Sequence, residues 1–168
     1  PAMLDAPRKA YVILHAEPEL DCANPVAARA ALDTAELVVV LSPFAHGATY
    51  ADVMLPVAPF TETAGTFVNC EGRVQSFNGV VKPLGETRPA WKVLRALGSM
   101  LGLAGFGFES IDEVRAEAVP AAGAIAGRLS NATSVPIAAP VAQTASLERV
   151  ADVPIYFADP LVRRAESL

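Results

Sequence analysis

Three short apolar runs divide the first third of the chain. They lie at Tyr11–His15, Leu37–Leu41 and Asp52–Val57, and their continuous, branched side chains favour strands that are covered on both faces. Between the first two runs, Asn24 can cap a helix whose first position is a proline, so we predict a helix over Pro25–Leu32. The AEPELDCANP stretch before that helix is predicted as a loop.

The order of these elements indicates the fold class. A strand, a helix, a strand, one helical turn within Ser42–Ala51 and a third strand are typical of a parallel sheet with right-handed crossovers. The sequence therefore predicts an α/β fold, a Rossmann-like parallel sheet with flanking helices and a small antiparallel hairpin element. Ligands of such sheets lie beyond the carboxyl ends of the strands, which lead here into HAEPELDC, SPFAHG and PVAPFTETAG.

The hairpin element is expected in the polar stretch that follows the third strand, TETAGTFVNCEGRVQ at Thr61–Gln75. Asn69–Gly72 has asparagine first and glycine fourth, as in a type I turn, between TFV and RVQSF. Asn78-Gly79 is typical of a type I′ turn leading into VVK as a further strand. The turns leave Glu62 and Arg73 unexplained, and a buried pair between them, with Arg73 structural, is our hypothesis.

The second half of the chain contains two well-marked helices. Pro89–Leu101 carries Trp91 and three leucines on one face and is followed by Gly102, a typical helix stop. Ser110 can cap a second helix over Ile111–Ala118.

Beyond Pro120 the composition shifts toward Ala, Pro, Ser and Thr. Asn131–Ser146 shows no period and is predicted as an extended surface segment. We predict a strand over Val153–Phe157 and a helix over Pro160–Leu168, whose apolar face needs a neighbour: a missing domain or, alternatively, the chain's own core. The domain prediction is residues 1–103 as the Rossmann-like domain, 104–130 as additional helices, 131–152 as an Ala/Pro-rich linker, and 153–168 as a strand and helix leading to a missing next domain.

Composition narrows the function classes. The 168 residues carry a net charge of −5 without a block of like charge, which argues against nucleic-acid binding. Hydrophobic residues make up 52%, yet no apolar run approaches the ~20 residues that span a bilayer, so we expect no direct membrane insertion and a cytoplasmic location. The apolar surplus favours a piece of a larger protein.

Cysteine and histidine counts limit redox and metal chemistry. Cys22 and Cys70 cannot by themselves ligate an iron–sulfur cluster, which usually takes four thiolates. A zinc site from these cysteines with His15 and His46 lacks the short ligand spacing of zinc motifs. We therefore assign no metal ligand and no catalytic residue.

Several motifs occur in a fixed order: ADVMLP at Ala51–Pro56, E-x-x-G-T-F-x-N at Glu62–Asn69, EGRVQ at Glu71–Gln75 and RPAWKVLR at Arg88–Arg95. Together they resemble the molybdopterin oxidoreductase family, and within it the branch found in bacterial NADH-quinone oxidoreductase, respiratory complex I. The likeness extends from Tyr11 to Leu103.

The resemblance carries expectations about cofactors and partners. It implies a parent subunit with iron–sulfur clusters elsewhere, no cofactor in this chain, and contacts with other domains of that subunit and other complex I subunits. The parent complex would place the chain on the cytoplasmic face of the inner membrane. Family members that hold molybdopterin guanine dinucleotide place it between such domains, with the EGRVQ region facing the crevice. The resemblance thus marks six vestigial pterin-crevice candidates: Glu62, Thr63, Gly65, Asn69, Arg73 and Gln75.

Two departures from the family pattern separate the possible functions. Gly72-Arg73 stands where some formate dehydrogenases have Arg-Arg, and HAEPELDCANP replaces the G-x-N-P of many cofactor-binding members. Both favour a structural module of an electron-transfer subunit. The alternatives are a cofactor-holding domain of an active molybdopterin oxidoreductase, and a nucleotide-binding module using Glu17, Glu19 or Asp21, although no G-x-G-x-x-G follows the first strand.

Overall fold

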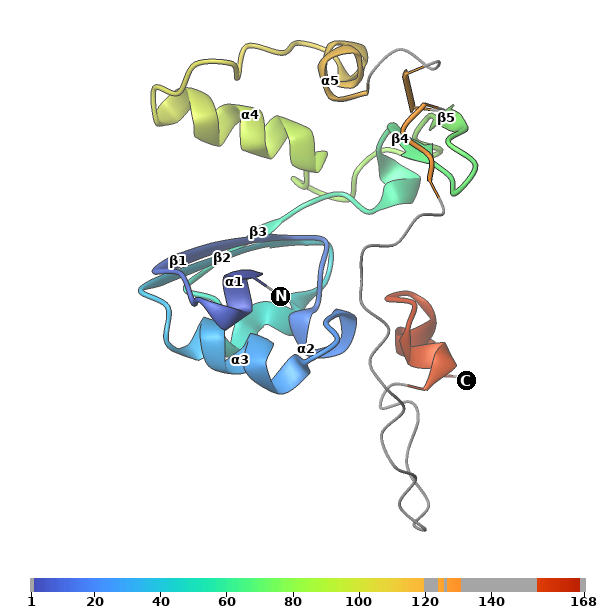
Figure 1. Ribbon diagram of the computed structural model, residues 1–168. Coiled ribbons are helices and arrows are strands. Elements are labelled where there is room, and N and C mark those ends of the chain that lie inside the picture. The colour runs from blue at the N-terminus through green and yellow to red at the C-terminus, as the bar shows by residue number, and fades with distance from the viewer. Residues whose placement is uncertain (1, 120–123, 126, 131–153, 167–168) are drawn as a thin grey trace.

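The computed structural model describes residues 2–119, 124–125, 127–130 and 154–166, and its centre is a three-stranded parallel sheet (Figure 1). The strands are β1 (Ala10–Leu14), β2 (Leu37–Ser42) and β3 (Val53–Pro56), in the order β1-β2-β3. β2 pairs with both neighbours, with Val12 opposite Val39 and Leu41 opposite Leu55. The predicted α/β fold with a parallel sheet is confirmed.

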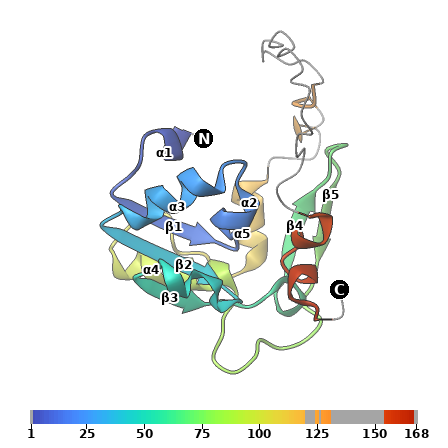
Figure 2. The same cartoon turned by 90° about the horizontal axis from the view of Figure 1, so that it is seen from below.

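Helices lie on both sides of this sheet. Figures 1 and 2 show α1 (Ala2–Asp5), α2 (Pro18–Asp21) and α3 (Pro25–Asp33) on one side and α4 (Ala90–Met100) on the other. The Asn24 side chain accepts a hydrogen bond from the Ala27 N–H at 2.9 Å, so the predicted cap of α3 is confirmed. The AEPELDCANP stretch is not all loop, because α2 forms within it. A 3₁₀ turn, Ala45–Thr49, supplies the expected single turn between β2 and β3.

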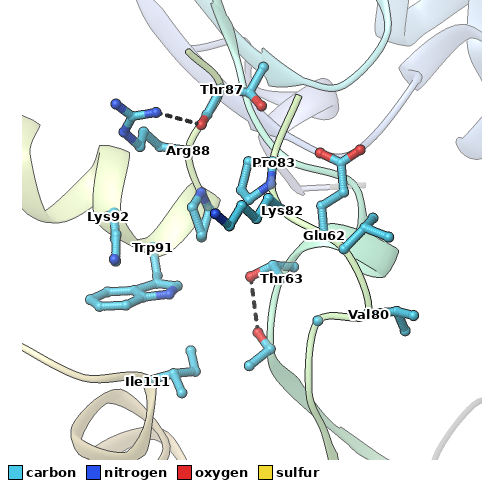
Figure 3. A pocket seen from close by; sticks show the side chains of 14 residues that line it. Glu62, Thr63, Val80, Lys82, Pro83, Thr87, Arg88, Trp91, Lys92 and Ile111 are labelled. Carbon is cyan, nitrogen blue, oxygen red and sulfur yellow. Dashed lines mark hydrogen bonds between the residues drawn. The ribbon is translucent and has the colours of Figure 1, made fainter. Parts of the chain in front are cut away.

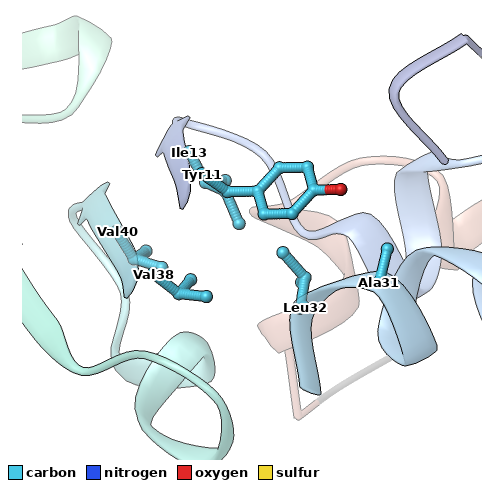
Figure 4. Packing of buried hydrophobic residues seen from close by; sticks show 6 residues of the cluster. All are labelled: Tyr11, Ile13, Ala31, Leu32, Val38 and Val40. Carbon is cyan, nitrogen blue, oxygen red and sulfur yellow. The ribbon is translucent and has the colours of Figure 1, made fainter. Parts of the chain in front are cut away.

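The main core lies between the sheet and α3 (Figure 4). Its buried members are Tyr11 and Ile13 of β1, Val38 and Val40 of β2, and Ala31 and Leu32 of α3. On the opposite face of β1, Val12 and Leu14 remain 60% and 41% exposed. The expectation of strands covered on both faces is therefore wrong for β1, because α3 covers only one side.

The polar stretch after β3 forms the expected antiparallel pair. β4 (Gly65–Val68) pairs with β5 (Val74–Phe77), and the Gly72 N–H donates to the Asn69 carbonyl at 2.9 Å to close the predicted turn. Gly72 has φ +76°, a conformation that glycine adopts without strain. The prediction of a second hairpin turn at Asn78-Gly79 is wrong, because the Val80 N–H instead donates to the Thr61 carbonyl at 2.8 Å.

The two later helices match their predictions closely. α4 is followed by Gly102 at φ +68°, and α5 (Ile111–Ala118) has Ser110 as its cap, with the Ser110 hydroxyl accepting from the Glu113 N–H at 3.2 Å.

The strand and the helix predicted near the C-terminus are wrong where the structure describes these residues. The described part of the predicted strand at 153–157 is a 3₁₀ turn, Ile155–Phe157, and the described part of the predicted helix at 160–168 contains only a second 3₁₀ turn, Val162–Arg164. The predicted extended segment at 131–146 and the linker at 131–152 lie outside the described residues. We call residues 154–166 the C-terminal strap. Its arginines bind acidic side chains near the end of β1, and these contacts fix its conformation.

Gly98 of α4 is expected to reject a side chain. A Cβ built at this position would lie 2.2 Å from Cγ of Phe106, so the whole ring would have to move. Alanine in a helix interior gains up to about 1 kcal/mol over glycine, but overpacking costs about 1–3 kcal/mol. We expect Gly98→Ala to lower the free energy of unfolding in a denaturant titration, and Met100→Ala, at a residue that is 86% exposed, to change it little. A stabilised Gly98→Ala would contradict the packing of Phe106.

Candidate functional site

Two hollows flank the loop that leads into β4. The strand-end hollow has a volume of about 470 Å³ and lies beyond the carboxyl ends of β1 and β2. It is lined by His15, Glu17, Ser42, Pro43, Phe44, His46, Pro59, Phe60, Thr63, Phe67, Asp159, Pro160 and Leu161. The cationic hollow has a volume of about 730 Å³ and lies between this loop, the segment after β5 and the start of α4 (Figure 3). Both volumes fall within the range of small-molecule sites, about 300–1,000 Å³.

Glu17 is the buried carboxylate of the strand-end hollow. Its residue is 3% exposed, and α2 fixes its backbone, because the N–H groups of Leu20 and Asp21 donate to the Glu17 carbonyl at 2.8 Å. The Asp21 side chain in turn accepts from the Glu17 N–H at 2.7 Å. The short helix α2, which the sequence pattern did not predict, is therefore what holds this carboxylate at the end of β1.

Two arginines of the C-terminal strap neutralise Glu17. Arg163 donates to Glu17 Oε2 at 2.8 Å and to Asp21 Oδ1 at 2.9 Å, and its side chain is 3% exposed. Arg164 donates to Glu17 Oε1 at 2.5 Å. Burial by itself would lower the pKa of Arg163, but the hydrogen bonds and charges of Asp21 and Glu17 outweigh it and raise that pKa. Arg163 therefore stays charged.

Arg164 also stacks on an aromatic side chain. Its guanidinium carbon lies 3.8 Å from the centroid of the Phe44 ring, and Phe44 lines the strand-end hollow. A planar cation over a ring face is attracted by the ring quadrupole. Arg164 thus presents one face to an aromatic ring and one edge to a carboxylate.

His46 adds a buried nitrogen to the same place. Its Nε2 lies 3.2 Å from the Ala16 carbonyl oxygen, which can only accept, so we assign the ring proton to Nε2. Nδ1 is buried and has no hydrogen-bond partner among the described residues. The nearest acidic oxygen, Glu17 Oε1, is 3.4 Å away. The hollow therefore contains a buried ring nitrogen whose hydrogen-bonding capacity is not used within the described structure.

Two further titratable groups lie in partly desolvated surroundings. Burial lowers the pKa of His15, the first residue after β1, which has φ +50°. Burial, together with the charge and hydrogen bond of Glu19, raises the pKa of Tyr50, whose hydroxyl donates to Glu19 at 3.2 Å.

The strap itself has a local cap. The Asp159 carboxylate accepts from the Leu161 and Val162 N–H groups at 2.8 and 2.9 Å, and these bonds lower the pKa of Asp159.

The cationic hollow gathers positive side chains around an aromatic ring. Lys82, Arg88 and Lys92 line it together with Trp91, and Lys92 Nζ lies 5.4 Å from the centroid of that ring. Its carboxylate, Glu62, accepts from the Leu84 N–H at 3.0 Å. The positive potential favours an anion near the start of α4, where Pro89 makes no side-chain cap.

The six pterin-crevice candidates are only partly brought together. Thr63 lines both hollows and Glu62 lines the cationic one, whereas Gly65 begins β4 against the Phe77 ring. The remaining three lie along the hairpin and are exposed: Asn69, Arg73 and Gln75. A cofactor contact for these six residues stays a prediction.

The hypothesis of a buried Glu62–Arg73 pair is wrong. The Arg73 side chain is 70% exposed and approaches Glu71 at 4.0 Å, while Glu62 binds the backbone of Leu84. The physical reason is the hairpin, because its turn carries Arg73 away from the loop that contains Glu62.

The residues of the ion cluster around Glu17, beside the strand-end hollow, were largely hidden in the sequence. Its pattern suggests Glu17 and Asp21 only as ribose ligands, and it assigns Arg163, Arg164 and His46 to no site. A buried carboxylate requires a cation, and the adjacent arginines of VRRAE are the one signal that could have found this cluster.

Comparison with known proteins defines the class. The profile of the molybdopterin oxidoreductase family matches residues 2–100, which include the whole parallel sheet and the hairpin. The chain belongs to the molybdopterin oxidoreductase family.

Relatives with individual names cover less of the chain. A protein of Staphylococcus aureus strain bovine RF122 / ET3-1, named as a putative formate dehydrogenase, is 43% identical over 75 residues, which are 44% of this chain and 8% of that protein. Its counterpart in strain USA300 is 41% identical over 75 residues with the same coverage. The match thus spans less than a tenth of the length of these relatives.

The described residues contain neither a membrane-spanning helix nor a cluster of metal ligands. Within the described residues, we find no helix with both the length and the apolar character needed to cross a bilayer. In the same part of the chain, no three His, Cys, Asp or Glu side chains converge as a metal ion would require.

Removal of Arg163 should be costly. Breaking a buried ion pair costs about 3–5 kcal/mol. We expect Arg163→Ala to lower the free energy of unfolding by about 3 kcal/mol, because Arg164 still contacts Glu17. The matched control is Lys9→Ala, which breaks a pair with Glu36 that is 84% and 69% exposed and should cost at most about 1 kcal/mol. Chemical denaturation measures both values. Equal costs would show that Arg163 is not buried in the ion cluster.

Removal of Arg73 should matter little. Because its side chain is exposed and its pair with Glu71 is loose, we expect Arg73→Ala to change the free energy of unfolding by at most about 0.5 kcal/mol. Thermal melting of the variant beside the parent is sufficient. A loss of several kcal/mol would restore the buried-pair hypothesis.

Proposed function

We propose that this chain is a cofactor-holding domain of a molybdopterin guanine dinucleotide oxidoreductase of the formate dehydrogenase type. The similarity to proteins named as formate dehydrogenases, 43% over 75 residues, carries the proposal. The family match over residues 2–100 supports it, because that range contains most of the residues that line the strand-end hollow.

The residues of the strand-end hollow fit one part of such a cofactor. Pterin and guanine are planar heterocycles with N–H groups on one edge. Phe44, Phe60 and Phe67 offer aromatic walls, Glu17 offers a carboxylate acceptor, and His46 contributes a buried Nδ1 without a hydrogen-bond partner among the described residues. Once the cofactor is bound, it supplies the redox chemistry. The residues of this chain would bind it, orient its rings and exclude water.

The cationic hollow suits the charged part of the same ligand class. Lys82, Arg88 and Lys92 can attract phosphate groups, as cations do at phosphate sites generally. Thr63 lines both hollows, so one extended ligand could contact both.

A second candidate is favoured by one specific observation. Arg163 and Arg164 fill the end of β1 with the chain's own side chains, as expected if the ancestral crevice no longer takes a cofactor. Under this candidate the chain is a structural module of the iron–sulfur electron-transfer subunit of NADH-quinone oxidoreductase. Iron–sulfur clusters would lie in other parts of that subunit, its partners would be other complex I subunits, and the complex would sit on the cytoplasmic face of the inner membrane.

Analysis of the full-length protein separates the two candidates. We expect protein purified from a host supplied with molybdenum and tungsten to contain one of these metals, to release a fluorescent pterin on oxidation, and to reduce an artificial electron acceptor with formate. Protein that contains neither metal nor pterin and copurifies with NADH dehydrogenase activity would overturn the first candidate in favour of the second.

A further inference from the structure

The surroundings of Arg164 resemble those of a bound heterocycle. Its guanidinium is planar, lies 3.8 Å from the Phe44 ring centroid, and donates edge-on to Glu17 at 2.5 Å. A guanine or pterin ring would use the same two contacts, because its 2-amino-4-oxo pyrimidine edge carries an N–H beside an NH₂ group. The guanidine unit, N–C(=N)–N, is common to the arginine side chain and to both rings.

The receiving group is an acceptor. Arg163 donates to Glu17 Oε2 and Arg164 donates to Glu17 Oε1, so Oε1 is the carboxylate oxygen that displacement of Arg164 frees. A site built on a carboxylate selects a donor-rich edge and leaves adenine at a disadvantage, because adenine places the bare N1 beside its single amino group. Nδ1 of His46 lies 3.4 Å from the same oxygen, is buried and has no hydrogen-bond partner among the described residues.

The strap that carries Arg164 is attached mainly by charge. Its large apolar side chains stay in solvent: Ile155 is 82% exposed, Tyr156 59%, Phe157 48% and Leu161 47%. Apolar burial therefore contributes little to docking. Buried ion pairs recover little more than their own desolvation cost, so the closed arrangement is finely balanced. A ligand that makes the same contacts can compete with it.

We propose that Arg164 is a built-in occupant of a subsite for a 2-amino-4-oxo pyrimidine edge, as found in guanine and pterin, and that the C-terminal strap holds this subsite closed until such a ligand displaces Arg164. Asp159, Pro160 and Leu161 line the strand-end hollow, so displacement of the strap opens that hollow from one side. The inference rests on the proposed function and adds the group that the ligand must displace.

Guanosine diphosphate is the probe, and adenosine diphosphate is the comparison. In the full-length protein prepared without cofactor, Arg164→Met removes the competing guanidinium and one of the two arginines that attach the strap to Glu17. A site that is open only about a tenth of the time binds about tenfold more weakly. We expect calorimetric titration to show at least this gain in guanosine diphosphate affinity for Arg164→Met, and no gain for adenosine diphosphate.

Two control variants separate the contacts. Arg115→Met removes a partly exposed arginine that pairs with Asp112 on α5 and donates to Ser76 of β5, and because Arg115 lines neither hollow it should leave both affinities unchanged. Glu17→Gln combined with Arg164→Met replaces one carboxylate oxygen by a donating NH₂ group and should abolish the preference for guanosine. Melting curves verify that each variant is folded, and Arg164→Lys, which keeps the charge without the planar edge, replaces Arg164→Met if that variant does not fold.

The proposed subsite can be disproved without disproving the proposed function. Unchanged guanosine diphosphate affinity in Arg164→Met, or an equal gain for adenosine diphosphate, overturns the subsite. So does a result in which millimolar guanidinium stabilises Arg164→Met while guanosine diphosphate does not bind, because the arginine would then be a structural clasp. In each case the metal and pterin content of the full-length protein still decides the proposed function independently.

Discussion

One buried carboxylate determines which distant parts of this chain contact each other, because its negative charge must be neutralised inside the protein. Glu17 stands at the end of β1, 3% exposed, and its neutralising partners lie 146 and 147 residues further along the chain. Solvent cannot compensate a charge at this depth, so the fold must supply a cation. Docking of the C-terminal strap, the closure of the strand-end hollow and the unusual position of Arg164 all follow from this requirement. The apolar core between α3 and the sheet stabilises the domain, but Glu17 connects the domain to the far end of the chain.

The sequence predicted the parts of the fold that depend on local pattern. The apolar runs, the Asn24 and Ser110 caps and the glycine after α4 specify their elements through short-range geometry, and all are found. The failures lie where tertiary contacts decide. The strap contains apolar residues at helical spacing, yet its arginines bind Glu17 and Asp21, which fixes it as two 3₁₀ turns. Val80 binds the Thr61 carbonyl, and this contact displaces the hairpin turn expected at Asn78-Gly79.

The sequence predicted where the candidate site lies but not which residues form it. Parallel topology placed it beyond the strand ends, and that is where the strand-end hollow lies. To name those residues, one must know which side chains that are far apart in the sequence meet in the folded protein. Thr63, a candidate that the family resemblance marks, lines the hollow, whereas His46 lines it and Arg164 reaches the adjoining Glu17 only through the packed structure. Arg73 shows the converse, because a short distance along the chain from Glu62 did not bring the two side chains together.

The burial of Arg163 also protects the peptide bond beside it. Trypsin-like proteases cleave the peptide bond that follows an arginine, and to do so they must draw that arginine side chain into a specificity pocket. Arg163 is 3% exposed and bound to two carboxylates, so it cannot enter such a pocket while the strap is docked. When opening and closing are fast relative to cleavage, the cleavage rate follows the population of the open form. The Arg163–Arg164 bond is therefore a natural reporter in which the rate of proteolysis measures how often the C-terminal strap leaves Glu17.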